Sequence, residues 1–164
     1  MIDVIERLTL LQQDTDALRL FALVDGVQYQ THRGEPIADK SEFYSLFKGT
    51  QDEALAHAGP WLVDTENLDE AFISDLAKLE REAPAVTWMI TSQSLEGLAQ
   101  LLQLNLDMRM PDGRTALLRF WDPRVLVSLA EVLSPEQRQT FFGHIREWHL
   151  LCKGKRAWVG MQPC

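Results

Sequence analysis

The chain is 164 residues long and 46% of its residues are hydrophobic, which is enough apolar material to form the core of one compact domain. Its 16 Lys and Arg residues against 24 Asp and Glu residues leave a formal net charge of −8, so the phosphate backbone of a nucleic acid would meet net repulsion. The opening MIDVIERLTLLQQD is acidic where a secretory signal is basic, and no apolar run approaches the roughly 18 residues of a membrane span. We therefore expect a cytoplasmic protein that binds neither nucleic acid nor membrane.

The first third of the chain indicates a helix, a buried strand and a second helix. In IDVIERLTLLQQD, apolar residues at helical spacing predict a helix. The continuous apolar run in ALRLFALVDGV predicts a buried strand that ends in a turn at Asp25 and Gly26. In SEFYSLFKG, a serine cap and apolar residues on one side predict a short helix over residues 41–49.

The middle third alternates strands and amphipathic helices. WLVD predicts a brief strand, and ENLDEAFISDLAKLERE predicts a helix that Pro84 stops. The β-rich AVTWMITS and the leucine-patterned SLEGLAQLLQL then predict a strand followed by a helix. This order favours a sheet flanked by helices.

A hairpin and two capped helices follow. NLDMRM and TALLRFW flank Pro111-Asp112-Gly113, a sequence that suits a tight turn between two strands. Asp122 and Pro123 are typical of a helix start, and Ser134-Pro135-Glu136-Gln137 predicts a capping box for a second short helix that ends near Gly143.

The last segment, HIREWHLLCKGKRAWVGM, predicts two strands around Lys153-Gly154-Lys155. Residues 1–164 are therefore expected to form a single α/β domain with a mixed or largely antiparallel sheet flanked by helices and a C-terminal β-hairpin. We expect the final strand to leave an edge of the sheet to which a partner segment could add by backbone pairing.

No catalytic motif and no metal site stands out. On a strand, His149 would point away from the face that His144 and Cys152 share, so the three cannot converge as ligands. Two cysteines, Cys152 and Cys164, cannot form a disulfide framework, and we expect both to be reduced. We predict no enzyme activity, no catalytic residues, no metal and no cofactor.

The segment Arg119-Phe120-Trp121-Asp122-Pro123-Arg124 allows two interpretations. In the first, Asp122 caps the helix and the arginines pair with nearby carboxylates. In the second, Arg and Trp side chains at the end of a strand form a binding surface, because these residue types are enriched at interface hot spots.

The amino-acid sequence of this region also resembles that of a known family. LLRFWDPRVL followed by LSPEQRQTFFGHIREW closely resembles the signature of the type VI secretion effector-chaperone family, the Tap or TEC adaptor proteins. RLFALVDGV resembles that family's first strand and turn, GPWLVD its second block, and WMITSQSLEGLAQLLQLNLDMRMPDGRTALLRFWDPRVL its long central block. These blocks follow one another in the family's order over nearly the whole chain.

The resemblance implies a cytoplasmic adaptor that is neither secreted nor catalytic. It implies two partners: a toxic effector, bound at its N-terminal region and kept soluble, and the spike protein of the secretion machine. Residues 119–124 match the family motif, and Asp25 and Gly26 match its early turn. We expect some residues to hold the fold, namely Asp25, Gly26, Asp122 and Pro123. The candidates for partner binding are Arg119, Trp121, Arg124, Trp148 and Trp158, of which the last two are expected to lie near one another on the closing hairpin.

A second hypothesis comes from the residues alone. Arg119 and Arg124 beside a helix start could hold an anionic small molecule, in which case the protein would be a small acidic enzyme or binding protein.

Overall fold

The computed structural model of the chain describes residues 2–15 and 17–160, so Cys164 lies outside the described residues. Six strands form one sheet in the order β2-β3-β1-β4-β7-β8, and every neighbouring pair is antiparallel. The strands are β1 (Arg19–Asp25), β2 (Phe43–Ser45), β3 (Pro60–Asp64), β4 (Val86–Thr91), β7 (Glu147–Cys152) and β8 (Lys155–Val159).

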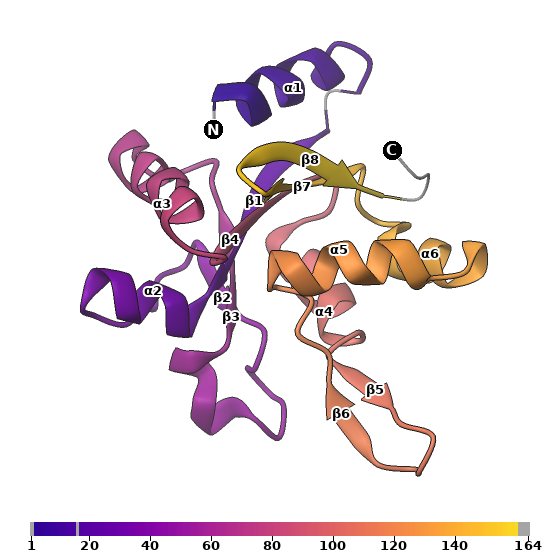
Figure 1. Cartoon of the computed structure of the whole chain (residues 1–164). Helices are drawn as coiled ribbons and strands as arrows, with labels where there is room; N and C mark the ends of the chain where they lie inside the picture. The colour runs from indigo at the N-terminus through magenta and orange to yellow at the C-terminus, as the bar shows by residue number, and fades with distance from the viewer. Residues whose placement is uncertain (1, 16, 161–164) are drawn as a thin grey trace.

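Helices cover both faces of this sheet (Figure 1). One face packs against α1 (Ile2–Gln12), α2 (Gly26–Arg33) and α3 (Glu70–Glu82). The other face packs against α4 (Leu95–Gln103), α5 (Pro123–Val132) and α6 (Pro135–Phe142). A short 3-10 helix, η1 (Glu53–Ala58), precedes β3. The prediction of a single α/β domain with a largely antiparallel sheet is therefore confirmed.

Strand β1 shows why the sheet divides the core in two. Successive side chains of a strand point to opposite faces, so Leu20 and Val24 join one apolar cluster while Phe21 and Leu23 join the other. All four are buried because helices cover both faces. This double burial explains why the sequence of β1 is a continuous apolar run rather than an alternating one.

The C-terminal hairpin also forms as predicted. Strands β7 and β8 pair up to Cys152 and Lys155. The two residues of the turn, Lys153 and Gly154, have φ values of 51° and 77°, and positive φ at both positions is what a tight two-residue hairpin turn requires. Strand β8 lies at the edge of the sheet, where the sequence placed it.

Two local predictions near the N-terminus are wrong. Residues 41–49 contain strand β2 and a following turn instead of a helix, because Phe43 and Ser45 pair with Val63 and Trp61 of β3. Asp25 and Gly26 do not form a turn after β1. Asp25 instead caps helix α2, which begins at Gly26.

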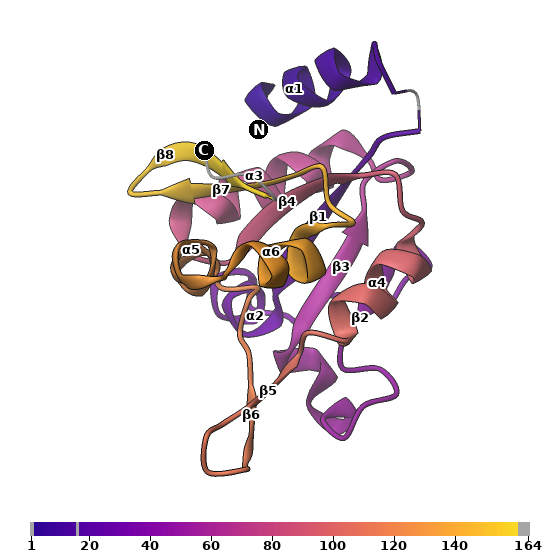
Figure 2. The same ribbon diagram turned by 90° about the vertical axis from the view of Figure 1, so that its right-hand side faces the viewer.

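A second, two-stranded sheet projects from the body of the molecule (Figure 2). It pairs β5 (Asp107–Arg109) with β6 (Thr115–Leu117), and Gly113 has a φ of 87° in the connecting loop. The hairpin was predicted, but β6 ends at Leu117 instead of continuing to Trp121. The chain bends there, with Phe120 N–H donating to the Leu118 carbonyl oxygen at 3.0 Å. Over the described residues, no helix has the length and apolar character to cross a bilayer.

Candidate functional site

The start of α5 is organised by Asp122. Its Oδ1 accepts a hydrogen bond from the Arg124 backbone N–H at 2.9 Å, and Pro123 occupies the first helical turn, where no backbone donor is needed. The Arg124 side chain returns to the same carboxylate, with Nε 3.0 Å from Oδ1 and Nη2 2.7 Å from Oδ2. Asp122 therefore has the structural role that its sequence context predicted.

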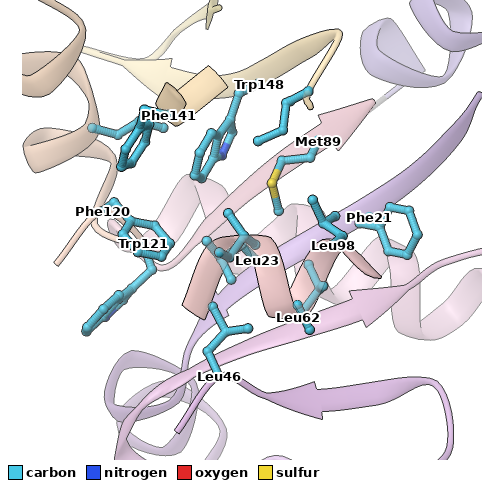
Figure 3. Packing of buried hydrophobic residues seen from close by; sticks show 14 of the residues in the cluster. Phe21, Leu23, Leu46, Leu62, Met89, Leu98, Phe120, Trp121, Phe141 and Trp148 are labelled. Atoms are coloured by element: carbon cyan, nitrogen blue, oxygen red, sulfur yellow. The ribbon is translucent and has the colours of Figure 1, made fainter. Parts of the chain in front are cut away.

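Phe120 and Trp121 lie inside the molecule. Phe120 is fully buried and packs edge to face against Trp148 at a centroid distance of 6.0 Å, and Trp121 packs in the same manner against Phe47 at 5.9 Å. Figure 3 shows Phe120, Trp121, Phe141 and Trp148 gathered beside the aliphatic core. A strand that continued through TALLRFW would place Phe120 and Trp121 on opposite faces, but both side chains point inward.

Asp25 and Gly26 form a second helix start beside the first. Asp25 Oδ1 accepts hydrogen bonds from the N–H groups of Val27 at 2.9 Å and Gln28 at 3.3 Å. Gly26 lies so close to the η1 segment that a Cβ atom would be 2.5 Å from the His57 carbonyl oxygen and 2.6 Å from that of Gly59. The backbone approach, and not a positive φ, requires glycine at this position.

Arg119 connects the two helix starts. Its Nη2 lies 4.0 Å from Asp25 Oδ2, and its guanidinium lies over the Trp121 ring at 5.9 Å from the centroid. Residues 119–124 and 25–26, which are far apart in the sequence, therefore form one cluster at the ends of α2 and α5. We call this set, Asp25, Arg119, Asp122 and Arg124, the paired-cap cluster.

The two carboxyl groups of the cluster have opposite pKa shifts. Burial raises the pKa of Asp25, and the nearby charge of Asp122 adds to the increase, while the hydrogen bonds from Gln28 and Val27 and the charge of Arg119 offset it only in part. Burial also raises the pKa of Asp122, but hydrogen bonds from Arg124 outweigh it and the net pKa is lowered. Asp122 is thus the more firmly ionised of the two.

The arginines are the accessible part of the cluster. The side chains of Arg119 and Arg124 are 57% and 72% exposed, whereas those of Asp25 and Asp122 are 4% and 12% exposed. A cavity of about 270 Å³ lies beside Arg124, between the end of α3 and the β7–β8 turn. Its lining residues include Glu82, Pro123 and Gly154. The cluster therefore presents two exposed cations beside two buried carboxylates.

The two tryptophans of the closing hairpin do not lie together. Trp148 is fully buried and donates its Nε1–H to Thr87 Oγ1 at 2.8 Å. Trp158 is the strand partner of His149, the residue after Trp148. Its side chain therefore points to the face of the sheet opposite that of Trp148, where it is 40% exposed. Of the five residues predicted to bind a partner, Arg119, Arg124 and Trp158 are accessible, while Trp121 and Trp148 belong to the core.

His149 is a buried partner of a carboxylate. Its Nε2 lies 2.8 Å from Glu147 Oε2, and its ring lies 5.4 Å from that of Trp158. His144 precedes β7, and its backbone carbonyl oxygen accepts a hydrogen bond from the Thr91 hydroxyl at 2.5 Å. Within residues 2–15 and 17–160, no three His, Cys, Asp or Glu side chains gather as metal ligands would.

Exposed apolar residues on the β5–β6 hairpin were not among the predicted binding residues. Met108, Met110 and Leu117 are 43%, 37% and 40% exposed, and Leu104 at the base of the hairpin is 79% exposed. Methionine is a flexible, polarisable side chain that is frequent at adaptable binding surfaces. The apolar-polar alternation of DMRM would ordinarily predict that Met108 and Met110 face a core. They are exposed instead, because the hairpin projects from the body of the molecule.

Comparison with known proteins gives one match. A family model described as Domain of unknown function (DUF4123) matches residues 20–140, a segment that contains the whole paired-cap cluster. Neither a curated protein nor a solved structure matches the chain.

Proposed function

The chain belongs to the DUF4123 family, and from this premise we propose that it is a cytoplasmic adaptor chaperone of a type VI secretion system. In this role it binds a toxic effector at the effector's N-terminal region, keeps it soluble and helps load it onto the spike protein. The proposed role involves no catalysis, no metal and no cofactor.

The observation that carries the proposal is the family match over residues 20–140, because this family is associated with type VI secretion effector adaptors. The match includes both helix starts of the paired-cap cluster. It therefore covers most of the segments that carried the resemblance, but not Arg19 or residues 141–148.

The geometry supports a role in protein binding. The side chains of Arg119 and Arg124 are exposed, and arginine is enriched among the residues that dominate interface energies. Arg124 lies in the first turn of α5, while Arg119 lies between β6 and α5, where its Nη2 is 4.0 Å from Asp25 Oδ2. The β5–β6 hairpin adds exposed methionine and leucine side chains. A partner that covered either surface would remove exposed apolar or charged groups from solvent.

Binding of a small anion is the second candidate, because two exposed cations lie within one cluster. The cluster also holds two carboxylates, however, and Asp122 already takes two hydrogen bonds from the Arg124 guanidinium. An anion would have to compete with Asp122 for this arginine. The arrangement therefore favours a protein partner over a free anion, and saturable binding of an anion that is lost in Arg119→Ala would reverse this preference.

Co-expression tests the proposal directly. The chain is expressed with and without the effector encoded beside its gene, and the purified sample is examined by size-exclusion chromatography with light scattering. We expect a stable complex of fixed stoichiometry and a higher soluble yield of the effector. Two separate peaks with a fully soluble effector would contradict the adaptor role.

A further inference from the structure

Helix α1 is attached to the body by a small apolar face. Val4 is fully buried, and Leu8 and Leu11 are partly buried against the cluster formed by α2, α3 and one face of the sheet. Ile5 and Leu10, on the same helix, remain 44% and 51% exposed. Figures 1 and 2 both show α1 at the end of the molecule that carries the β7–β8 hairpin.

Ion pairs provide the rest of this attachment. Arg7 donates from Nε to both oxygens of Glu147 at 3.0 Å and from Nη2 to Oε1 at 2.5 Å. Arg156 of β8 donates to Asp3 at 2.7 Å and to Glu80 of α3 at 2.7 and 2.9 Å. The side chains of Glu147 and Glu80 are only 7% and 3% exposed. We call the surface under α1, formed by α3, β7 and β8, the α1 seat.

The seat has defined chemical requirements. A buried carboxylate is costly unless a cation pairs with it, and Arg7 is the α1 residue that meets this need for Glu147. A helix that occupies the seat therefore has to place a basic residue opposite Glu147. Relative to this basic residue, apolar residues are needed at positions −3, +1 and +4. In α1 these are Val4, Leu8 and Leu11. An acid four positions before the basic residue faces Arg156.

Helix α1 does not fill the seat. A groove of about 890 Å³ lies on one side of it, lined by Asp3 and Glu6 together with Ala77, Glu80 and Arg156. A cavity of about 240 Å³ lies on the other side, between Leu8 of α1 and Ile73 of α3. Protein interiors are normally close-packed, so this space leaves room for a helix with larger side chains than those of α1.

A helix as short as α1 is also easily released. Isolated helices of about 12 residues are marginal in water, and segments with few buried apolar contacts open before the rest of a domain unfolds. Release of α1 would expose an apolar floor surrounded by Glu80, Glu147 and Arg156.

We propose that the α1 seat is the binding site for an amphipathic helix of the effector, and that this helix displaces α1 by reproducing its pattern of acid, apolar and basic residues. This inference rests on the proposed adaptor function and names the kind of effector segment that is recognised. In the free protein α1 occupies the seat and competes with the effector, so loosening α1 strengthens effector binding.

Two matched variants of the full chain test the inference. Val4→Ser removes the buried contact of α1, and Leu10→Ser makes the same type of change on its exposed side. If the seat is open in at most about a tenth of the molecules, loosening α1 tightens effector binding by about tenfold or more. We expect Val4→Ser to give this gain, together with faster tryptic cleavage after Arg7, and Leu10→Ser to leave both unchanged. Thermal melting checks that each variant is folded.

A peptide provides a second measurement that needs no effector. A labelled peptide of residues 2–14 should bind the Val4→Ser chain at least about tenfold more tightly than it binds the unaltered chain, because in the latter α1 holds the seat closed. A peptide with Arg7→Glu should not bind, because it puts a carboxylate against Glu147. Equal binding of both peptides, or of neither, overturns the inference.

The outcomes separate the inference from the proposed function. If the unaltered chain binds the effector and Val4→Ser leaves this affinity unchanged or weakens it, the adaptor role stands. The α1 seat is then not the binding site. The same conclusion follows if Leu10→Ser, rather than Val4→Ser, changes the affinity. Absence of any complex removes the adaptor role, while the peptide measurement still decides whether the seat accepts a helix.

Discussion

The Asp122 carboxylate binds both the backbone and the side chain of Arg124. It accepts one hydrogen bond from the Arg124 backbone N–H, in the first turn of α5, and two from the Arg124 guanidinium. A residue that caps the helix therefore also positions an exposed cation. The interpretations of residues 119–124 as a helix start and as a binding surface are compatible, because the same carboxylate can serve both.

Asp122→Ala should lower the free energy of unfolding by about 0.5 to 2 kcal/mol, the usual cost of losing a helix cap. Asp122→Asn retains an acceptor oxygen for the Arg124 N–H and should lose less. Urea unfolding measures both variants. Equal stability of Asp122→Ala and the unaltered chain would show that the cap does not contribute.

Arg119→Ala and Arg124→Ala should leave the free energy of unfolding within about 0.5 kcal/mol of the unaltered value, since both side chains are largely exposed. We expect each to weaken the effector complex by about tenfold or more, as a hot-spot arginine does. Arg114→Ala makes the same change on the β5–β6 hairpin, where Arg114 pairs with Asp112 two positions away and is 84% exposed, and so distinguishes the paired-cap cluster from the hairpin as the binding surface. Loss of binding in Arg114→Ala alone would move the interface to that hairpin.

Trp121→Ala should destabilise the domain by about 3 to 5 kcal/mol, because it removes a large buried ring. A lost complex in this variant would then reflect unfolding and not a missing contact. Trp158→Ala removes a ring that is 40% exposed and should cost less. Thermal melting followed by tryptophan fluorescence distinguishes the two, and similar losses would contradict the burial difference.

The stability of the domain should fall as the pH decreases below about 6.5, and His149 is the cause. Burial lowers the pKa of His149 below its usual 6.5, and the hydrogen bond and charge of Glu147 oppose this only in part, while Arg156 adds to the decrease and Asp3 opposes it. The unfolded chain then binds a proton that the folded chain does not, so stability is lost from 6.5 down to the folded pKa.

The measurement is the free energy of unfolding of the unaltered chain and of His149→Gln between pH 7.5 and 5. Carboxylates such as Asp122, whose pKa is lowered from 3.8, lose their contribution only at lower pH. The difference in the free energy of unfolding between the two proteins should therefore change as the pH falls below 6.5, before the carboxylates titrate. Parallel profiles would show that His149 titrates alike in both states.

Gly26→Ala should destabilise the domain by about 1 to 3 kcal/mol or more, because its Cβ would overlap two carbonyl oxygens of the backbone. Gly34→Asn provides the contrast, since a Cβ at Gly34 would meet nothing within 4 Å and its φ of 76° is a conformation that asparagine tolerates. Comparable losses in the two variants would rule out the close approach as the reason for glycine at position 26.

Local sequence signals predicted the elements that local chemistry determines. The caps at Asp122 and Ser134, the turn at Gly113 and the hairpin at residues 153–154 all depend on residues within a few positions of one another. The helix expected over 41–49 was wrong, because β2 exists only through its pairing with β3. Tertiary pairing of this kind overrides a short helical pattern.

The candidate site was partly predictable for the same reason. The cap role of Asp122 can be predicted from Asp-Pro, but Arg119 and Asp25 are 94 residues apart in the sequence and come into contact only through the tertiary fold. The burial of both Phe120 and Trp121 could not be predicted from strand alternation, because the chain leaves the extended conformation after Leu117. The accessible residues of the site are consequently fewer than the sequence suggested.

The attachment of α1 also has a temporal consequence. Arg7 and its partner Glu147 are 140 residues apart in the chain, so a ribosome that adds about 5 to 20 residues per second makes the helix roughly 7 to 28 s before its acidic partner exists. During that interval α1 is an amphipathic segment without its seat, and it can bind only after β7 and β8 have been synthesised.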